Sequence, residues 1–384
     1  MIARRLSAIT PFHVMALLAR ARQLEAEGRF VVHMEIGEPD FVSPTPIIDA
    51  GIKALHAGYT HYTPSGGLPA LREAIANDYQ ARFGVAIAPG RILVTPGASG
   101  ALQLIIAALV DPGSRVLMTD PGYPCNRNFV YLYDGEPVAV PVDAKHDYQF
   151  DRETLEAHWT DNTVAALIAS PSNPTGTALS RPRMAELRQV VRRHGGHLIV
   201  DEIYQNLYYG DKPFTALELG DDVFVINSFS KYFGMTGWRL GWLVAPEAFI
   251  EPLNILAQNL FLAAPTPAQY AALAAFGPET RRILEERREA FRTRRDYLLP
   301  ALQSLGFVIH AEPAGAFYLY ADCSRFSDDS FGFADTLLET AGVAVTPGID
   351  FGSHNANRYL RFAYTTSLEQ LQLGVARIKA FAGQ

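Results

Sequence analysis

From residue 91 to residue 244 the chain alternates short apolar runs with segments of helical periodicity, and this alternation restricts the possible folds more than any other feature. Apolar runs without interspersed polar residues are typical of strands buried on both faces of a mostly parallel sheet. Strand and helix in turn predict βαβ units, and hence an α/β fold with a large three-layer domain. The predicted strands are Arg91–Val94, Arg115–Met118, Val164–Ala169, His197–Val200, Val223–Asn227 and Leu240–Val244. The predicted helices are Pro46–Ala57, Leu68–Phe83, Ser99–Val110, Pro124–Tyr133 and Arg181–His194.

The rhythm of the sequence changes after about residue 280. A long charged helix is predicted at Glu279–Leu305, and the segments after it are typical of an α+β unit. A helix at Met15–Arg29 and a strand at Val31–Ile36 precede the alternating block, and we expect them to pack with this C-terminal unit. The sequence thus predicts a large domain at 46–284 and a smaller α+β domain made of 1–45 and 285–384. The C-terminal segments are Phe307–His310, Phe317–Tyr320, a helix near Phe333–Ala341, Tyr359–Tyr364 and a last helix.

Charge and composition exclude several classes of function. The net charge of −7 argues against nucleic acid as a main partner. No run is long enough to span a membrane, and the two cysteines, Cys125 and Cys323, suit a reducing compartment. The basic start of the chain is followed by no apolar signal-peptide core, so we expect a cytoplasmic protein. No H-E-x-x-H, C-x-x-C or phosphate-binding G-x-x-x-x-G-K motif is present, and no metal site is predicted.

The segment Ser228–Arg239 places a single lysine, Lys231, among apolar and aromatic residues. Burial disfavours the ammonium form, and a neutral amine can form a Schiff base with a carbonyl. Ser230 and Arg239 could hold an anion beside that carbonyl. Pyridoxal phosphate carries both an aldehyde and a phosphate, so this segment is predicted to anchor that cofactor. The same letters spell the S-x-x-K of penicillin-binding proteins, but no Ser-Asp-Asn or Lys-Thr-Gly element accompanies them.

Two further groups of residues follow predicted strands, at the edge where open α/β sheets bind their ligands. The small residues Gly97, Ala98 and Ser99 open a helix, so their backbone N–H groups could bind a phosphate. A tight turn capped by Ser99 is the simpler interpretation when the segment is taken alone. Asp201 could pair with a cationic ring nitrogen, or it could be a helix cap or a solvated acid. Tyr204 could donate to a phenolate-like oxygen, although a core tyrosine is the more frequent case.

Three other polar or aromatic residues are candidates for the same site. Asn173 precedes a proline, so a cis bond is possible there, and its amide could reach a ring oxygen instead of serving an ordinary Asn-Pro turn. Tyr123 could stack on a flat heterocycle or pack in the core. Arg361 lies within an otherwise apolar strand and needs an anionic partner, which could be a substrate carboxylate or an internal acid.

In their joint order these segments resemble the class I aminotransferases, the aspartate aminotransferase-like fold type I enzymes of pyridoxal phosphate. The resemblance runs from Pro11–Met15 and Ile36–Asp40 to Tyr359–Arg361, and it is closest at Ser172–Gly176, Asp201–Tyr204 and Ser228–Arg239. It implies Schiff-base formation at Lys231, pairing of Asp201 with the pyridine nitrogen, and binding of the 3-oxygen by Tyr204 and Asn173. It further implies ring stacking by Tyr123 and a carboxylate clamp made of Arg361 and the backbone of Gly37. The phosphate would be held by Gly97, Ala98, Ser99, Ser228, Ser230, Arg239 and, from the partner subunit of a homodimer with composite sites, Tyr62.

The resemblance implies transfer of an amino group between an L-amino acid and a 2-oxo acid by a ping-pong mechanism. In dicarboxylate-specific relatives, an arginine of the partner subunit often binds the distal carboxylate of the substrate. The matching stretch here, Leu240–Thr280, contains no lysine or arginine, so we expect neutral aliphatic or aromatic substrates. One alternative is a lyase on the same fold, acting as a C–S β-lyase or an aminocyclopropane carboxylate synthase-like enzyme. Another is a cofactor-sensing regulator, but the match begins near Pro11 and leaves no room for a DNA-binding domain.

Overall fold

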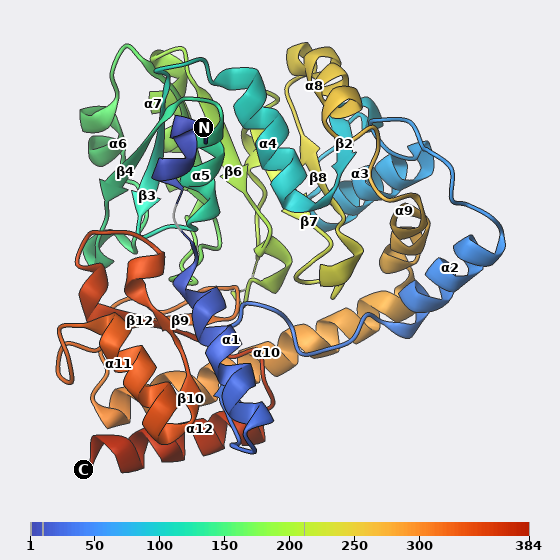
Figure 1. The fold of residues 1–384 in the computed structure, drawn as a ribbon. Coiled ribbons are helices and arrows are strands. Elements are labelled where there is room, and N and C mark those ends of the chain that lie inside the picture. The colour runs from blue at the N-terminus through green and yellow to red at the C-terminus, as the bar shows by residue number, and fades with distance from the viewer. Residues whose placement is uncertain (1, 10, 211, 384) are drawn as a thin grey trace.

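The computed structural model describes residues 2–9, 11–210 and 212–383, and a seven-stranded sheet forms its centre (Figure 1). The strand order is β2-β8-β7-β6-β5-β3-β4. The pairs from β7 to β4 are parallel, whereas β8 is antiparallel to both of its neighbours. This mixed, mostly parallel sheet confirms the predicted fold class. Its strands are β2 (Ile92–Thr95), β3 (Arg115–Asp120), β4 (Glu136–Pro141), β5 (Thr163–Ala169), β6 (His197–Asp201), β7 (Val223–Ser228) and β8 (Gly241–Val244).

Successive residues of the central strands enter different hydrophobic clusters, which explains their uninterrupted apolar sequences. In β6, for example, Leu198 and Val200 belong to one cluster and Ile199 to the other. Both faces of the sheet are therefore dry and covered by helices, as expected for parallel strands. One cluster includes residues of α4 (Gly97–Leu109), α5 (Cys125–Leu132) and α8 (Glu247–Leu260). The other includes residues of α3 (Pro69–Phe83), α6 (Arg152–His158), α7 (Arg181–Arg193) and α9 (Thr266–Leu273).

A smaller group of elements combines the two ends of the chain. Strand β1 (Val32–His33) pairs in parallel with β10 (Val343–Ala344), which joins the N-terminal segment to the C-terminal one. Beside this pair lies a three-stranded antiparallel sheet in the order β11-β12-β9. The elements of this group are α1 (His13–Ala26), β9 (Tyr318–Asp322), α11 (Ser330–Thr336), β11 (Thr346–Pro347), β12 (Tyr359–Ala363) and α12 (Leu368–Ala382).

Helix α10 (Pro278–Leu305) connects the two groups of elements. It contacts α2 (Thr45–His56) at one end of the molecule and α12 and β9 at the other. Figure 1 shows it running along the lower edge of the molecule from α2 to the C-terminal helices. Among the described residues, none of the helices combines the length and the apolar character that crossing a bilayer requires.

Two local predictions are wrong, and one strand of the sheet was not predicted. The strand expected at Val31–Ile36 has only two residues in the structure, because the chain after His33 turns toward the sheet edge. The apolar run Phe307–His310 forms only an isolated bridge between Val308 and Asp322. Strand β4 was not predicted, because it lies at the exposed edge of the sheet and contains two prolines.

Candidate active site

A cavity of about 350 Å³ lies where the carboxyl ends of the parallel strands face the smaller group of elements. Several of the residues singled out in the sequence line it from both sides. They are Gly37, Ala98, Ser99, Tyr123, Asn173, Asp201, Tyr204, Lys231 and Arg361. Segments far apart in the sequence thus meet at one place, as the topology of an open α/β sheet predicts. Tyr318, which the sequence analysis did not single out, also lines the cavity.

Lys231 follows β7, and its amine reaches across the cavity to the opposite wall. Its Nζ donates a hydrogen bond to the backbone oxygen of Gly37, at 2.6 Å. The Lys231 pKa is lowered to about 8, chiefly by burial; the positive charges of Arg361 and Arg239 act in the same direction, and Glu38 and Asp201 oppose the shift. A lysine with such a pKa is partly neutral near physiological pH, so it can act as a nucleophile and exchange protons.

Asp201 ends β6 and has one oxygen directed at the backbone. Its Oδ1 accepts a hydrogen bond from the Ile203 N–H, at 3.0 Å. Burial raises the pKa of the Asp201 carboxyl to about 6, while the Ile203 N–H and the charge of Lys231 lower it. Within the described part of the chain, its other oxygen has no hydrogen-bond partner. This oxygen is therefore free to accept a hydrogen bond from a protonated, cationic ring nitrogen bound in the cavity.

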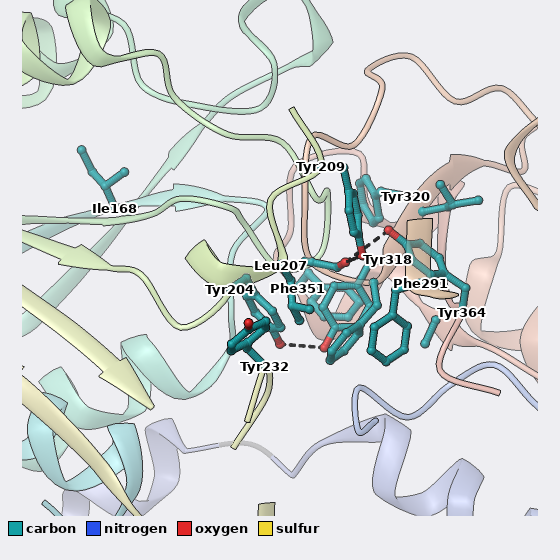
Figure 2. Close-up of a cluster of buried hydrophobic side chains, with 14 of the residues drawn as sticks. Ile168, Tyr204, Leu207, Tyr209, Tyr232, Phe291, Tyr318, Tyr320, Phe351 and Tyr364 are labelled. Atoms are coloured by element: carbon teal, nitrogen blue, oxygen red, sulfur yellow. Dashed lines mark hydrogen bonds between the residues drawn. The ribbon is translucent and has the colours of Figure 1, made fainter. Parts of the chain in front are cut away.

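Two tyrosine hydroxyls meet at the wall of the cavity. Tyr204 follows β6, Tyr318 begins β9, and their hydroxyl oxygens are 2.8 Å apart, which Figure 2 shows as a dashed line. The Tyr318 hydroxyl also explains the glycine at position 37, because a Cβ there would collide with it. The sequence marked Tyr318 as part of a strand, but the strand pattern alone does not reveal which face borders the cavity.

Arg361 is 5% exposed and reaches the cavity from β12. Its guanidinium donates to Asn173 Oδ1 at 2.9 Å, to the Glu35 carbonyl at 2.5 Å and to Thr346 Oγ1 at 3.2 Å. The aromatic rings of Tyr318 and Phe351 flank it, with centroids 4.3 Å and 4.8 Å from Cζ. The alternative of an internal salt bridge is wrong for the described residues, since no carboxylate lies within ion-pair distance of Arg361.

The unused atoms around Arg361 and Asn173 are suited to a ligand. The buried Nε of Arg361 has no hydrogen-bond partner in the described structure. The Asn173 amide nitrogen likewise has none among the described residues, and the bond from Asn173 to Pro174 is cis, as considered from the sequence. An anionic group from a substrate would satisfy the arginine, because an unpaired buried charge is costly.

The start of α4 at Gly97 and Ala98 lies close to the segment Arg239–Gly241, and together they form what we call the anion-binding corner. Gly97 has φ +71°, and a Cβ built on it would lie 2.6 Å from Nη2 of Arg239. A Cβ on Gly241 would lie 2.7 Å from the Ala98 nitrogen. Glycine is therefore required at both places so that the Arg239 guanidinium can lie over the start of α4. The helix N-terminus and this guanidinium both favour an anion there.

Two serine hydroxyls stand next to this corner. Ser228 Oγ donates to Ser230 Oγ at 3.0 Å or to the Leu240 carbonyl at 3.2 Å, and both serines are buried. Arg239 itself is exposed, and its Nη1 donates to the Thr236 carbonyl at 3.1 Å. The corner therefore fits a phosphate by its donor set: an arginine, hydroxyls and free helix N–H groups.

Tyr62 does not join the site within this chain. Its side chain is 81% exposed, and it is absent from the cavity wall. By contrast, Tyr123 stands at the wall with 40% of its surface exposed, and its ring centroid lies 6.3 Å from that of Phe12. One face of a flat ligand could therefore pack against Tyr123 without any movement of the backbone.

The donor set as a whole fits pyridoxal phosphate. The free Asp201 oxygen could hold the ring nitrogen of this cofactor, Asn173 with Tyr204 could hold its 3-oxygen, and Arg239 could hold its phosphate. A lysine of lowered pKa stands between them for its aldehyde. Of the groups that sequence reasoning missed, Tyr318, Phe351 and the Glu35 carbonyl support Arg361 and carry no recognisable motif of their own.

Comparison with known proteins gives a consistent result over the whole chain. The family profile of aminotransferase class I and II matches residues 30–378. The chain is 40% identical over 384 residues to a (5-formylfuran-3-yl)methyl phosphate transaminase of Methanocaldococcus jannaschii, covering 99% of each chain. It is 35% identical to a valine–pyruvate aminotransferase of Mycobacterium tuberculosis, covering 96% of each. A solved structure of aspartate aminotransferase from Thermus thermophilus with maleate superimposes with a TM-score of 0.93 at 33% identity, covering 99% of both chains.

Proposed function

The chain belongs to the class I and II aminotransferases, which use pyridoxal phosphate, and we propose that its amino acid substrates are neutral, with aliphatic or aromatic side chains. One observation carries the proposal: among the described residues that line the cavity, the only cations are Lys231 and Arg361. Both are needed close to the reacting carbon, so neither remains for a second carboxylate. The acid Glu38 also lines the cavity and would repel one, whereas the buried Glu35 carboxylate pairs with His33 at 2.7 Å.

The remaining wall of the cavity is largely apolar. Phe12, Val14 and Met15 come from the start of α1, and Leu102 and Phe129 come from α4 and α5. Burial of an aliphatic or aromatic side chain against these residues contributes roughly 1.5–3 kcal/mol. The relatives act on different compounds: one name specifies valine and pyruvate, another a furan phosphate, and others aspartate. The apolar wall of the cavity in this chain supports an amino acid substrate with a neutral side chain.

Each site residue has a proposed part in the transfer. Pyridoxal phosphate, when bound, supplies an aldehyde and an electron-accepting ring. Asp201 would hold a proton on the ring nitrogen, while Tyr204 and Asn173 bind the 3-oxygen. Lys231 would bind the aldehyde in the resting enzyme and move a proton at the substrate Cα, because its tether keeps the amine beside that carbon.

The other residues would fix the two ends of the ligands. Arg361 and the Gly37 backbone would bind the substrate α-carboxylate, and Tyr123 would stack on the ring. The phosphate would be bound by Gly97, Ala98, Ser99, Ser228, Ser230 and Arg239. Together these contacts would hold the ring, the substrate carboxylate and the transferred proton in the same geometry in each reaction cycle.

Two features of the whole assembly belong to the same proposal. We infer a homodimer, in which the exposed Tyr62 of each chain reaches the phosphate of the other. We also infer that 46–284 and 1–45 with 285–384 are the two domains, with the cavity between them. The β1–β10 pair supports this division, because it fastens the N-terminal segment to the C-terminal one.

The proposed specificity is tested by steady-state kinetics with a panel of L-amino acids and either pyruvate or 2-oxoglutarate as acceptor. Leucine, methionine, phenylalanine and tyrosine are expected to give higher kcat/KM values than aspartate. A hundredfold preference for aspartate would contradict the proposal. Assaying pyruvate and ammonia from an S-substituted cysteine in the absence of any acceptor tests the C–S β-lyase alternative, since elimination of the thiol from Cβ releases both products without a second substrate.

A further inference from the structure

Helix α5 presents one buried amide to an otherwise apolar part of the cavity. Asn126 lies in the first turn of α5, lines the cavity and is 7% exposed. Phe129, one turn further along the same helix, lines the cavity beside it. In the part of the chain that the structure describes, the Asn126 side chain makes no hydrogen bond, whereas its backbone N–H donates to the Tyr123 carbonyl at 3.1 Å.

An amide in this position affects which ligands are tolerated. An amide that is shut off from water without a partner costs about 1–3 kcal/mol. A purely apolar side chain placed against Asn126 would displace water and leave the amide unpaired. A ligand group that can donate or accept a hydrogen bond would avoid this cost, and sites built to bind a polar group discriminate strongly against analogues that lack it.

We propose that Asn126 is a specificity-determining residue that favours substrates whose side chain carries a neutral hydrogen-bonding group on an apolar stem. The group is a hydroxyl, a carboxamide or a ketone. The stem follows from Phe12, Leu102 and Phe129, which line the same cavity. The neutrality follows from Glu38, since a second carboxylate would meet a like charge there, and from the lack of a further cation among the described residues that line the cavity. The inference rests on the proposed function, because it refines the class of neutral amino acids.

The test compares pairs of amino acids of nearly equal shape that differ in one polar group. Suitable pairs are valine with threonine, leucine with asparagine, methionine with glutamine, and phenylalanine with tyrosine. In the wild-type enzyme, kcat/KM of the polar member is expected to exceed that of its partner about tenfold or more for the pair whose group reaches Asn126. In Asn126→Leu, which keeps the volume and removes the amide, this ratio is expected to fall at least tenfold.

A binding measurement separates recognition from catalysis. The holoenzyme is titrated calorimetrically with 3-phenylpropionate and with 3-(4-hydroxyphenyl)propionate, which carry the carboxylate but no amino group. If the wild-type enzyme prefers tyrosine to phenylalanine, it should also bind the hydroxylated acid more tightly than 3-phenylpropionate. In Asn126→Leu the ratio of these two Kd values is expected to fall as the ratio of the kcat/KM values does. If the leucine variant does not fold, the same measurements are made on Asn126→Ala, whose smaller side chain cannot clash with its neighbours.

Asn128→Leu is the matched control. Asn128 lies on the same helix and its Oδ1 is buried without a partner in the described structure, but it is not among the residues that line the cavity. Its substitution is expected to leave every polar-to-apolar ratio within twofold of the wild type. If Asn126→Leu and Asn126→Ala also leave all four ratios within twofold, the inference is wrong.

Failure of the inference can be told apart from failure of the proposed function. A strong preference for aspartate over all eight neutral amino acids would overturn the proposed function, whatever Asn126 does. Equal responses of the wild type and the Asn126 variants within the neutral pairs would overturn only the inference.

Discussion

Burial adjusts the protonation of individual residues at the centre of the site. The same enclosure lowers the Lys231 pKa to about 8 and raises the Asp201 pKa to about 6. Both shifts bring the groups closer to neutrality, because a low-dielectric site disfavours either charge. Other atoms of the site lack a hydrogen-bond partner in the described structure, such as the Nε of Arg361 and the amide nitrogen of Asn173. Residues in this state are suited to ligands and add little to the stability of the fold.

The pKa of Lys231 leads to a prediction about cofactor capture. The amine is protonated below its pKa and neutral above it, and only the neutral form attacks an aldehyde. The rate at which apoprotein binds pyridoxal phosphate covalently should therefore rise as the pH increases through about 8. Stopped-flow absorbance after mixing, followed by borohydride reduction and peptide mapping, measures the rate and the site.

Lys231→Ala provides the control for this measurement. It should abolish covalent capture and lower amino transfer by at least about 10²–10⁴-fold, the usual contribution of a positioned acid–base group. A rate of capture that is flat between pH 6 and pH 10 would contradict the assigned pKa. Normal turnover of the variant would contradict the role of Lys231.

The candidate residues that sequence reasoning found are those whose chemistry stands out at the end of an apolar strand. Asp201, Asn173 and Lys231 each follow such a strand, and the sheet brings them to one edge. Tyr318 and Asn126 escaped notice because tyrosine in a strand and asparagine in a helix turn are ordinary. Only the three-dimensional structure shows that their polar atoms border the cavity.

Among the secondary-structure elements, the start of α1 depends on a residue more than three hundred positions away. The backbone N–H groups of His13 and Val14 both donate to the carboxylate of Asp350, each at 2.8 Å. The following residue, Phe351, packs on Arg361. Ser353 then donates from its N–H to Asp120, at 2.9 Å, at the end of β3. Residues 350–354 therefore link the α1 wall, the carboxylate clamp and the sheet edge.

This linkage predicts a kinetic effect of Asp350→Ala. The variant leaves two helix N–H groups without their acceptor, which costs about 0.5–2 kcal/mol. Because Phe12, Val14 and Met15 belong to the wall that α1 holds in place, KM for the amino acid should rise about tenfold while pyridoxal phosphate absorbance is unchanged. Steady-state kinetics measure KM, absorbance spectra measure the bound cofactor, and a thermal melt of the same preparation measures the loss of stability.

Asp151→Ala is the matched control for the loss of a helix cap. Asp151 caps α6 by accepting from the Thr154 N–H at 2.7 Å, and it is not among the cavity residues. Both variants should have a lower Tm, but only Asp350→Ala should have a higher KM. A comparable rise of KM in both variants would show that general destabilisation, and not the position of α1, is responsible.

The elements themselves could be predicted where the sequence period is strong. The buried strands and the amphipathic helix Arg181–Arg193 were predicted to within a residue or two. Strand β4 was missed because its edge position leaves most of its residues partly exposed. The cap at Asp350 could not be predicted, because no local pattern connects residue 350 with residue 13.

For the molecule as a whole, exposed side chains bear on the proposed dimer. Tyr62 is 81% exposed, and the apolar side chains of Ile52, Leu55 and Leu262 are also exposed. Burying such side chains between two chains would favour association, because it removes apolar surface from water. Hydrodynamic measurements should therefore give the mass of two chains, and an active monomer would refute the proposed composite site.

A mixing experiment tests whether Tyr62 acts across the interface. Tyr62→Ala and Lys231→Ala are each expected to have low activity. When the two are unfolded together and refolded, each mixed dimer contains one site with both native residues, provided that Tyr62 serves the other chain. Activity should then reappear in the mixture but not in either variant treated alone. Continued inactivity of verified mixed dimers would place Tyr62 outside the site of the partner.

The 28-residue helix α10 has a mechanical consequence for the cavity. At about 1.5 Å per residue it is about 42 Å long, and it is rooted against α2 at one end and against α12 at the other. The stretch 278–299, before Pro300 interrupts the backbone hydrogen bonds, is about 33 Å long, so a tilt of about 5° at its root displaces its other end by nearly 3 Å. The walls of the cavity carried by α1 and β12 could thus be drawn apart or brought together by a change of angle too small to disturb any side-chain packing at the pivot.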